Sequence, residues 1–307
     1  MAVIRSTDHP DLLDIPLNEV FHLHLKEVPP EYKKWCNVES TDMAFEDSIK
    51  VSEFGTVPTK AEGALFQFEN IDTSATKRIT PVEIGLGYVV TRKMRDDDKH
   101  GVIVNLTTAL RRSFRDAFEI RAARIFNNAT SSTAEFLGLD GQPLLDTAHP
   151  LMGGGTQANK PTTDLDLSEL AVEAAVLNFH ARSGENGRPR IVTPKLCVTT
   201  GAQQYAAAQI FRNAMKYDTA NNSENWVRQG PDSNGISDYL ASRYITDTGF
   251  WILLTDKAQH DLTLRVRVNP EFQVGSDFRT DNYLARGYAR LDSGFFNWQF
   301  AYGSTGT

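Results

Sequence analysis

Residues 100–129 constrain the fold more than any other stretch, because HGVIVNLTTALRRSFRDAFEIRAARIFNNA predicts one long helix. No glycine or proline follows Gly101, and apolar residues recur at steps of three or four, which places them on one helical face. The main members of this apolar stripe are Leu106, Leu110, Phe114, Phe118 and Ile125. About 27 helical residues span roughly 40 Å, more than the width of a typical compact domain. The rest of the chain must therefore supply a long surface for the helix to pack on.

The other faces of this helix are charged. Arg112 and Asp116 are four residues apart, as are Arg115 and Glu119, so both pairs are spaced for ion pairs along the helix. Such pairs stabilise a helix by only about 0.2 to 0.5 kcal/mol each. We therefore expect packing of the apolar stripe, and not the charges, to hold the helix in place.

The segment before the helix predicts an arm followed by a projecting hairpin. Residues 1–50 are charged and punctuated by proline, with few apolar residues at any regular period, which is typical of a segment that lies on other surfaces. Residues 64–70 (ALFQFEN) alternate apolar and polar, and residues 77–93 are rich in β-branched and aromatic side chains. The polar residues 70–77 between them are expected to form the turn of a long hairpin.

The second half of the chain predicts a separate α/β region. Residues 137–164 are rich in glycine, proline and threonine and are expected to form an ordered loop. Residues 165–214 then read as helix, strand, helix. Further strands are expected at YLASRYIT, FWILLTD and LTLRVRV, and the chain ends with aromatic-rich strands.

Composition excludes several classes of function. The formal net charge of −7 argues against non-specific binding to nucleic acid, which depends on basic surface. Only Cys36 and Cys197 are present, far apart and without metal-ligand spacing, which fits a reducing cytoplasmic setting and excludes a zinc ribbon. No apolar run approaches the roughly 20 residues that span a bilayer, so no membrane association is expected.

One candidate catalytic pair is present in the sequence DTAHP. Asp146 is spaced to orient His149 for base catalysis, which would make the protein a hydrolase. No GxSxG nucleophile elbow accompanies the pair. The alternative interpretation, a turn fixed by Asp146 and Pro150, is favoured.

Neither a metal nor a cofactor is expected. His22 and His24 would lie on one face of a strand, but no third ligand is near them in the sequence. The three carboxylates at 96–98 are typical of a solvated helix start, where the helix dipole favours negative charge. The glycine-rich MGGGTQ at 152–157 lacks the Lys-Ser/Thr ending of a phosphate loop.

An arm, a projecting hairpin and an oversized helix suit an interlocked assembly, because segments that cannot bury themselves must be buried against neighbours. The chain also resembles the Mu-like group of tailed-phage major head proteins. The residues that carry the resemblance are FENIDTSATKRITPVEIGLGYVVTRKMRDDD, LRRSFRDAFEIRAARIFNNA, GLDGQPLLDTAHPL, RIVTPKLCVTT, FWILLTD and ARGYARLDSGFFNWQFAYGS.

The resemblance implies an α+β chain with the Hong Kong 97 type capsid fold. Residues 1–50 would then form the N-terminal arm, and 51–99 the extended loop with its leading strand. Residues 100–164 would form a peripheral domain carrying the spine helix. Residues 165–260 would form the axial domain, and 261–307 would return to the peripheral domain as C-terminal strands.

The resemblance also implies a structural role without catalysis. The protein would assemble into hexamers and pentamers of an icosahedral head that encloses packaged double-stranded DNA without reading its sequence. Its partners would be other copies of itself, a scaffolding protein, a portal and a decoration protein. Assembly would occur in the bacterial host cytoplasm, and the final location would be the virion head. An encapsulin-type nanocompartment shell is the alternative of the same fold.

The charged faces of the long helix are expected to meet neighbouring subunits. The candidate intersubunit contacts are Arg111, Arg112, Arg115, Glu119, Lys77, Arg78, Trp226 and Arg228.

Overall fold

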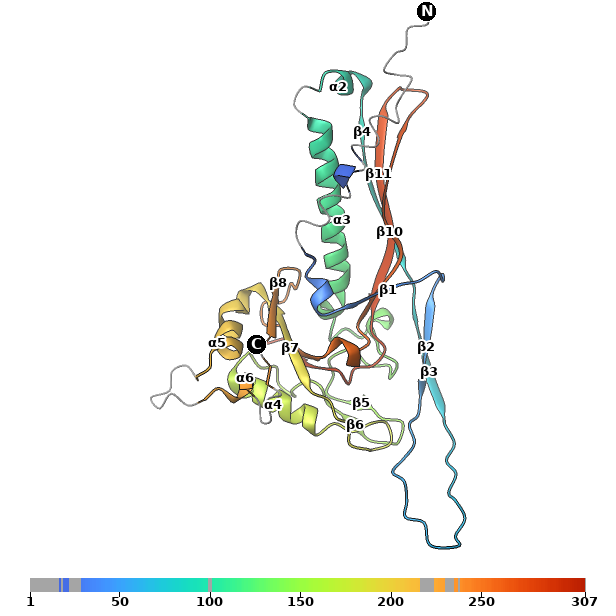
Figure 1. Cartoon of the computed structure of the whole chain (residues 1–307), viewed down its shortest axis with the longest axis vertical. Coiled ribbons are helices and arrows are strands. Elements are labelled where there is room, and N and C mark those ends of the chain that lie inside the picture. The colour runs from blue at the N-terminus through green and yellow to red at the C-terminus, as the bar shows by residue number, and fades with distance from the viewer. Residues whose placement is uncertain are drawn as a thin grey trace, which may run out of the picture.

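The computed structural model describes residues 17, 19–21, 29–98, 101–215, 224–229, 235–236 and 238–306. Figure 1 shows an elongated spine, a more compact α/β unit at one side of its base, and a narrow two-stranded ribbon that ends in a long loop. The expected α+β class is confirmed by this mixture of helices and sheets.

The spine consists of one helix beside one four-stranded sheet. Helix α3 (Val102–Asn127) has 26 residues and confirms the predicted long helix to within two residues at either end. The sheet has the order β1 (Asn37–Ser40), β10 (Thr263–Ser276), β11 (Tyr283–Gly294), β4 (Val82–Val90). Strand β1 is parallel to β10, and the other pairs are antiparallel. The sheet supplies the long surface that the helix requires.

The apolar stripe of α3 packs on this sheet. Leu110, Phe114, Phe118 and Ile125 are buried in the main hydrophobic core, and Leu106 packs at its margin. Phe114 fits where β11 carries Gly287: a Cβ atom at that glycine would lie 2.3 Å from the Phe114 ring. The missing side chain therefore lets the helix and the sheet approach closely.

The start of α3 depends on the acidic run before it. The Asp98 carboxylate accepts hydrogen bonds from the backbone N–H groups of Val102 (2.9 Å) and Ile103 (3.1 Å). Gly101 has a φ of 65°, in the left-handed region that favours glycine. The acidic run thus contributes a carboxylate that caps unsatisfied N–H groups at the helix start, as expected.

The α/β unit is built on a second four-stranded sheet of order β12 (Ala301–Ser304), β9 (Trp251–Thr255), β7 (Pro194–Thr200), β8 (Asp238–Ser242). Helices α4 (Glu169–His180), α5 (Gln204–Arg212) and α6 (Trp226–Gln229) accompany it. Strand β9 is buried on both faces: Trp251 and Leu253 join the core beneath the helices, while Ile252 and Leu254 join the main core of the spine. Strand β9 thereby contributes side chains to the cores of both the spine and the α/β unit.

The predicted hairpin is wrong in its first strand, its pairing and its turn, although residues 82–90 of the expected strand 77–93 do form β4. Strand β3 (Thr73–Ile79) covers most of the expected turn, and its antiparallel partner is β2 (Glu46–Val51), inside the expected arm. Residues 64–70 belong to no strand and lie in the loop 52–72 that connects β2 and β3. The ribbon projects away from the body (Figure 1), and its strands are held by backbone pairing.

The remaining elements are short. They are helix α2 (Arg92–Asp96), strands β5 (His149–Pro150) and β6 (Thr156–Gln157), and the 3-10 turns Tyr32–Lys34, Ala134–Phe136, Gly201–Gln203 and Lys257–Gln259.

Candidate functional site

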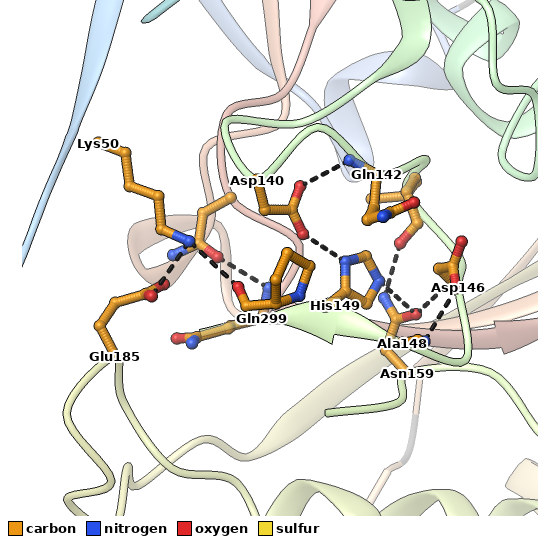
Figure 2. Close-up of polar contacts among 12 residues, drawn as sticks. Lys50, Asp140, Gln142, Asp146, Ala148, His149, Asn159, Glu185 and Gln299 are labelled. Atoms are coloured by element: carbon orange, nitrogen blue, oxygen red, sulfur yellow. Dashed lines mark hydrogen bonds and ion pairs between the residues drawn. The ribbon is translucent and has the colours of Figure 1, made fainter. Parts of the chain in front are cut away.

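The candidate catalytic histidine is a fully buried structural residue. His149 Nδ1 lies 2.5 Å from an Asp140 carboxylate oxygen, and its Nε2 lies 3.0 Å from Asn159 Oδ1 (Figure 2). Asn159 donates through its Nδ2 to Leu144 O at 2.6 Å, so its Oδ1 acts as acceptor toward the ring. The ring also stacks on Trp298, with 4.1 Å between centroids. Both nitrogens are occupied, and none is left to take a proton from a substrate.

The predicted partner Asp146 does not touch this ring. Its Oδ1 accepts the backbone N–H of Ala148 at 2.8 Å, which is a local turn contact. Pairing of Asp146 with His149 for base catalysis is therefore wrong, and the turn interpretation of Asp146 is confirmed. The carboxylate that meets His149 is that of Asp140, nine residues upstream.

A second polar contact ties the root of the projecting ribbon to the body. Lys50 on β2 lies 3.0 Å from a carboxylate oxygen of Glu185, and both side chains are about nine-tenths buried. Lys50 Nζ also lies 3.4 Å from Pro150 O. These contacts, seen at the left of Figure 2, fix where the ribbon leaves the molecule.

No metal centre is apparent in the part of the chain that the structure describes: no three His, Cys, Asp or Glu side chains there gather as ligands. His22 and His24 lie outside the described residues. Both cysteines are buried and unpaired. None of the described helices has the length and apolarity needed to cross a membrane.

Two of the charged residues on α3 that were expected to meet neighbouring subunits are instead buried in their own chain. Arg111 donates to the backbone carbonyl of Val20 at 3.1 Å. Glu119 accepts from the backbone N–H groups of Glu31 (2.6 Å) and Tyr32 (3.1 Å). Burial raises the pKa of Glu119, and these hydrogen bonds oppose the shift. The expectation for Arg111 and Glu119 is wrong because both hold the N-terminal segment against the helix.

The expected ion pairs along α3 are also replaced. Arg115 lies 3.1 Å from the adjacent Asp116, which further accepts a hydrogen bond from the Tyr244 hydroxyl at 3.1 Å. Arg112 remains exposed. The spacing of four residues therefore does not decide the partners here.

Lys77 is a third residue for which the expected contact with a neighbouring subunit is wrong. The residue is only 8% exposed, and its Nζ lies 4.2 Å from the centre of the Phe295 ring. Within the described residues Nζ has no hydrogen-bond partner. Burial lowers the pKa of Lys77 to about 8, while the nearby Asp261 carboxyl opposes that shift. Burial in turn raises the pKa of Asp261 to about 6.

The other contact candidates lie on the surface. Arg78 pairs with Asp47 at 2.7 Å across the ribbon and covers the Phe45 ring at 3.6 Å. Trp226 is 55% exposed, and Arg228 is exposed beside it on α6. On α3, Arg112 is exposed and Arg115 is half-buried.

Several strongly exposed apolar side chains lie on the loop 52–72, where no residue was named as a contact candidate. Val57, Leu65, Phe66 and Phe68 on the loop 52–72 are 89%, 94%, 74% and 91% exposed. Clusters of this kind mark contact surfaces, because water solvates them poorly. The sequence signal was the alternation in residues 64–70, which indicated a strand, whereas the structure places these residues in no strand.

The comparisons with known proteins agree with this geometry. The family described as phage capsid protein matches residues 74–304. No curated protein matches the chain. In structure, the chain is similar to the procapsid of bacteriophage JBD30, with a TM-score of 0.55, 15% identity, and coverage of 99% of this chain and 77% of that one.

Two further solved structures share the fold. The match to Microbacterium phage Oxtober96 has a TM-score of 0.57 at 10% identity and covers 91% of this chain and 92% of that one. The match to a virus-like particle from Pyrococcus furiosus has a TM-score of 0.54 at 10% identity and covers 94% and 97%. The long helix against a four-stranded sheet, the projecting ribbon and the separate α/β unit are thus the Hong Kong 97 type fold, and the chain belongs to the phage capsid protein family as a major capsid protein that builds the shell.

Proposed function

We propose that the chain is a Mu-like major head protein. It assembles into hexamers and pentamers that close an icosahedral shell around packaged double-stranded DNA. The observation that carries this proposal is the loop 52–72, whose aromatic side chains are exposed on a ribbon that leads away from the subunit's own cores. When each subunit contacts the next one head to tail, the subunits form a closed ring if the rotations between neighbours add up to a full turn.

The parts of the subunit take different roles in this assembly. The spine with α3 and its sheet forms the peripheral domain, and the α/β unit at 165–260 forms the axial domain around the ring axis. Residues 1–50 form an arm, although the structure places 46–51 in the ribbon. Arg78, Arg112, Arg115, Trp226 and Arg228 remain contact candidates on the exposed surface.

The same proposal covers the partners and the location. A scaffolding protein, a portal and a decoration protein join the shell, which assembles in the host cytoplasm and ends as the virion head. The net charge of −7 suits a wall that does not adhere to its genome. The subunit needs no cofactor and performs no catalysis, and the buried His149 site supports this assignment.

Electron microscopy of the purified chain, alone and with a scaffolding protein, tests the proposal. Regular shells, rings or tubes are the expected result. A chain that stays monomeric at high concentration in both conditions would contradict it. Shells purified from cells should contain DNA and a portal, whereas shells filled with enzyme would instead support the encapsulin-type alternative.

A further inference from the structure

Among the described strands, β4 lies at one edge of the spine sheet and leaves that edge without a partner strand. It is the last strand in the order β1-β10-β11-β4, and its nine residues pair with β11 alone among the described strands. Val82, Leu86 and Val89 along it are 38%, 54% and 61% exposed. Natural proteins protect such edges with lysine, proline or a covering segment, because free backbone N–H and C=O groups recruit another strand. The sequence VEIGLGYVV contains one charged residue and no proline, so this edge has little protection of its own.

The loop 52–72 contains a segment with the sequence pattern of a strand that pairs with no sheet of the described chain. Residues 64–70 alternate, with Phe66 and Phe68 on one side and Leu65, Gln67 and Glu69 on the other. In the isolated chain this segment belongs to no described ladder. Phe66 meets only the Lys60 ammonium among described ring contacts, at 4.9 Å from the ring centre.

The two features match in spacing. On β4, Ile84 and Tyr88 pack toward α3, so Gly85 and Gly87 share the opposite face of the sheet. A hollow of about 590 Å³ lies over these glycines and is walled by Gln273, Arg286 and Tyr288, among others. A pair of aromatic residues two positions apart on an added strand would cover a pair of glycines two positions apart on the edge. Aromatic side chains are a known means of covering such edge glycines.

One of the two glycines has no evident role inside the subunit. A Cβ at Gly87 would lie 2.6 Å from Ala285 O, so the chain itself requires glycine there. A Cβ at Gly85 would lie 3.6 Å from Gly287 O, which is an ordinary contact. Glycine inside a strand weakens it and often marks the close approach of another chain. The glycine at position 85 is therefore best explained by the close approach of another chain to β4.

The loop cannot reach this edge in its own subunit. The chain runs from the loop through β3 directly into β4, away from the tip, as Figure 1 shows. At about 3.3 Å per residue, the 20 residues from Phe66 to Leu86 cover on the order of 65 Å of mostly extended chain. Only a second copy can bring the two segments together.

We propose that residues 64–70 of one subunit add to the open edge of β4 in the next subunit as a fifth strand of its spine sheet, with Phe66 and Phe68 seated over Gly85 and Gly87. This inference rests on the proposed function and specifies where its loop binds. Two aromatic side chains bury roughly 300 to 500 Å² together. A stable interface buries about 800 Å² per partner, so this added strand acts together with other contacts between the same two subunits.

The register can be tested without knowing the strand direction. Whether the added strand is parallel or antiparallel, placing the two phenylalanines over the two glycines puts residue 67 opposite residue 86. The double variant Gln67→Cys/Leu86→Cys should therefore form a disulfide between subunits, because cross-strand Cβ atoms lie close enough to be bridged. The natural Cys36 and Cys197 are 1% and 0% exposed and do not compete.

The assay uses particles that microscopy has first shown to be assembled. After mild oxidation, non-reducing gel electrophoresis should show a ladder of covalent oligomers for the double variant. The matched control Gln67→Cys/Val82→Cys moves the second cysteine four residues along the same face, about 13 Å away. This control should give at least tenfold less covalent oligomer. Assembled particles without the ladder, or an equal ladder in the control, would overturn the inference and leave the proposed function intact. Absence of particles from the unmodified chain would instead overturn the proposed function.

A second variant keeps the test independent of cysteine chemistry. Gly85→Thr fills the hollow with a residue that suits a strand and that its own chain can accommodate. We expect an unchanged melting midpoint of the subunit and at least a tenfold lower particle yield. The control Gly275→Thr, on β10 where no atom of the described residues lies within 4 Å of an added Cβ, should assemble normally. Normal assembly of Gly85→Thr would contradict the inference.

Discussion

The contact between Phe114 and Gly287 offers the sharpest test of how the spine is built. Phe114 is 3% exposed and packs edge-on against Phe21, with 6.1 Å between ring centroids. Its ring occupies the space where residue 287 would carry a Cβ, at 2.3 Å and 2.7 Å from two ring carbons. A methyl group at 287 and the ring at 114 therefore exclude each other.

This exclusion sets the expected energies. Phe114→Ala should cost about 3 to 5 kcal/mol in unfolding free energy, through lost burial and the cavity left behind. Gly287→Ala should cost about 1 to 3 kcal/mol, because it overpacks the helix against the sheet. In the double variant the new methyl group enters space that the ring has vacated. The combined loss should be smaller than the sum of the two single losses by about 1 to 3 kcal/mol.

Urea unfolding of the unassembled subunit, followed by circular dichroism, measures all four proteins of this cycle. Phe118→Ala combined with Gly287→Ala is the matched control, because Phe118 is also buried but lies one turn further along α3. The losses of unfolding free energy from Phe118→Ala and Gly287→Ala should be additive. If the losses of Phe114→Ala and Gly287→Ala also add within about 0.5 kcal/mol, the close approach of helix and sheet at this point is refuted.

Three further predictions concern other parts of the subunit. Lys77→Met should raise the unfolding free energy at pH 7 by about 1 to 3 kcal/mol, because it removes a buried charge. Since the pKa of Lys77 is lowered to about 8 in the folded state, the difference should shrink as the pH rises from 8 toward 10.5, and a pH-independent difference in urea titrations would contradict this cause. His149→Phe should cost about 3 to 5 kcal/mol because it leaves the Asp140 carboxylate buried without its partner. Asp146→Asn should cost less than about 1 kcal/mol, since the amide oxygen can still accept from the backbone; equal losses in thermal melts would show that the two residues act together. Replacing residues 56–68 with a short Gly-Ser linker should leave the melting midpoint of the subunit unchanged and abolish particles in electron micrographs, whereas intact shells would remove the loop from assembly.

The sequence predicts those elements whose own residues create a buried face. Helix α3 follows from a stripe of apolar residues at helical spacing, and that stripe is buried as its period implies. Strand β9 was likewise recognisable, because residues 250–254 (FWILL) are all apolar and the strand is buried on both faces.

The ribbon could not be predicted in the same way. Strand β3 reads TSATKRI and β2 reads EDSIKV, so neither carries a continuous apolar face. Their pairing depends on backbone hydrogen bonds, which leave little trace in side-chain patterns. The alternation in residues 64–70 was visible, but an alternating pattern does not reveal whether its partner lies in the same chain.

The buried charges were mispredicted for a related reason. Arg111 and Glu119 bind backbone groups of the N-terminal segment, which lie 91 and 88 residues away in the sequence. A charge on a helix is normally solvated, and no local pattern indicates that a distant backbone will cover it. The partner of His149 was missed similarly, because Asp146 was nearer in sequence than Asp140.

The long antiparallel pair β10–β11 also determines how the wall responds to mechanical load. Its hydrogen bonds run perpendicular to strands that extend along the spine beside α3 (Figure 1). Tension along the spine therefore shears many of these bonds at once, so they share the force, whereas sideways peeling would break them one after another. The register shifts between Val266 and Glu271 interrupt this ladder, which makes that point the natural place for the wall to flex.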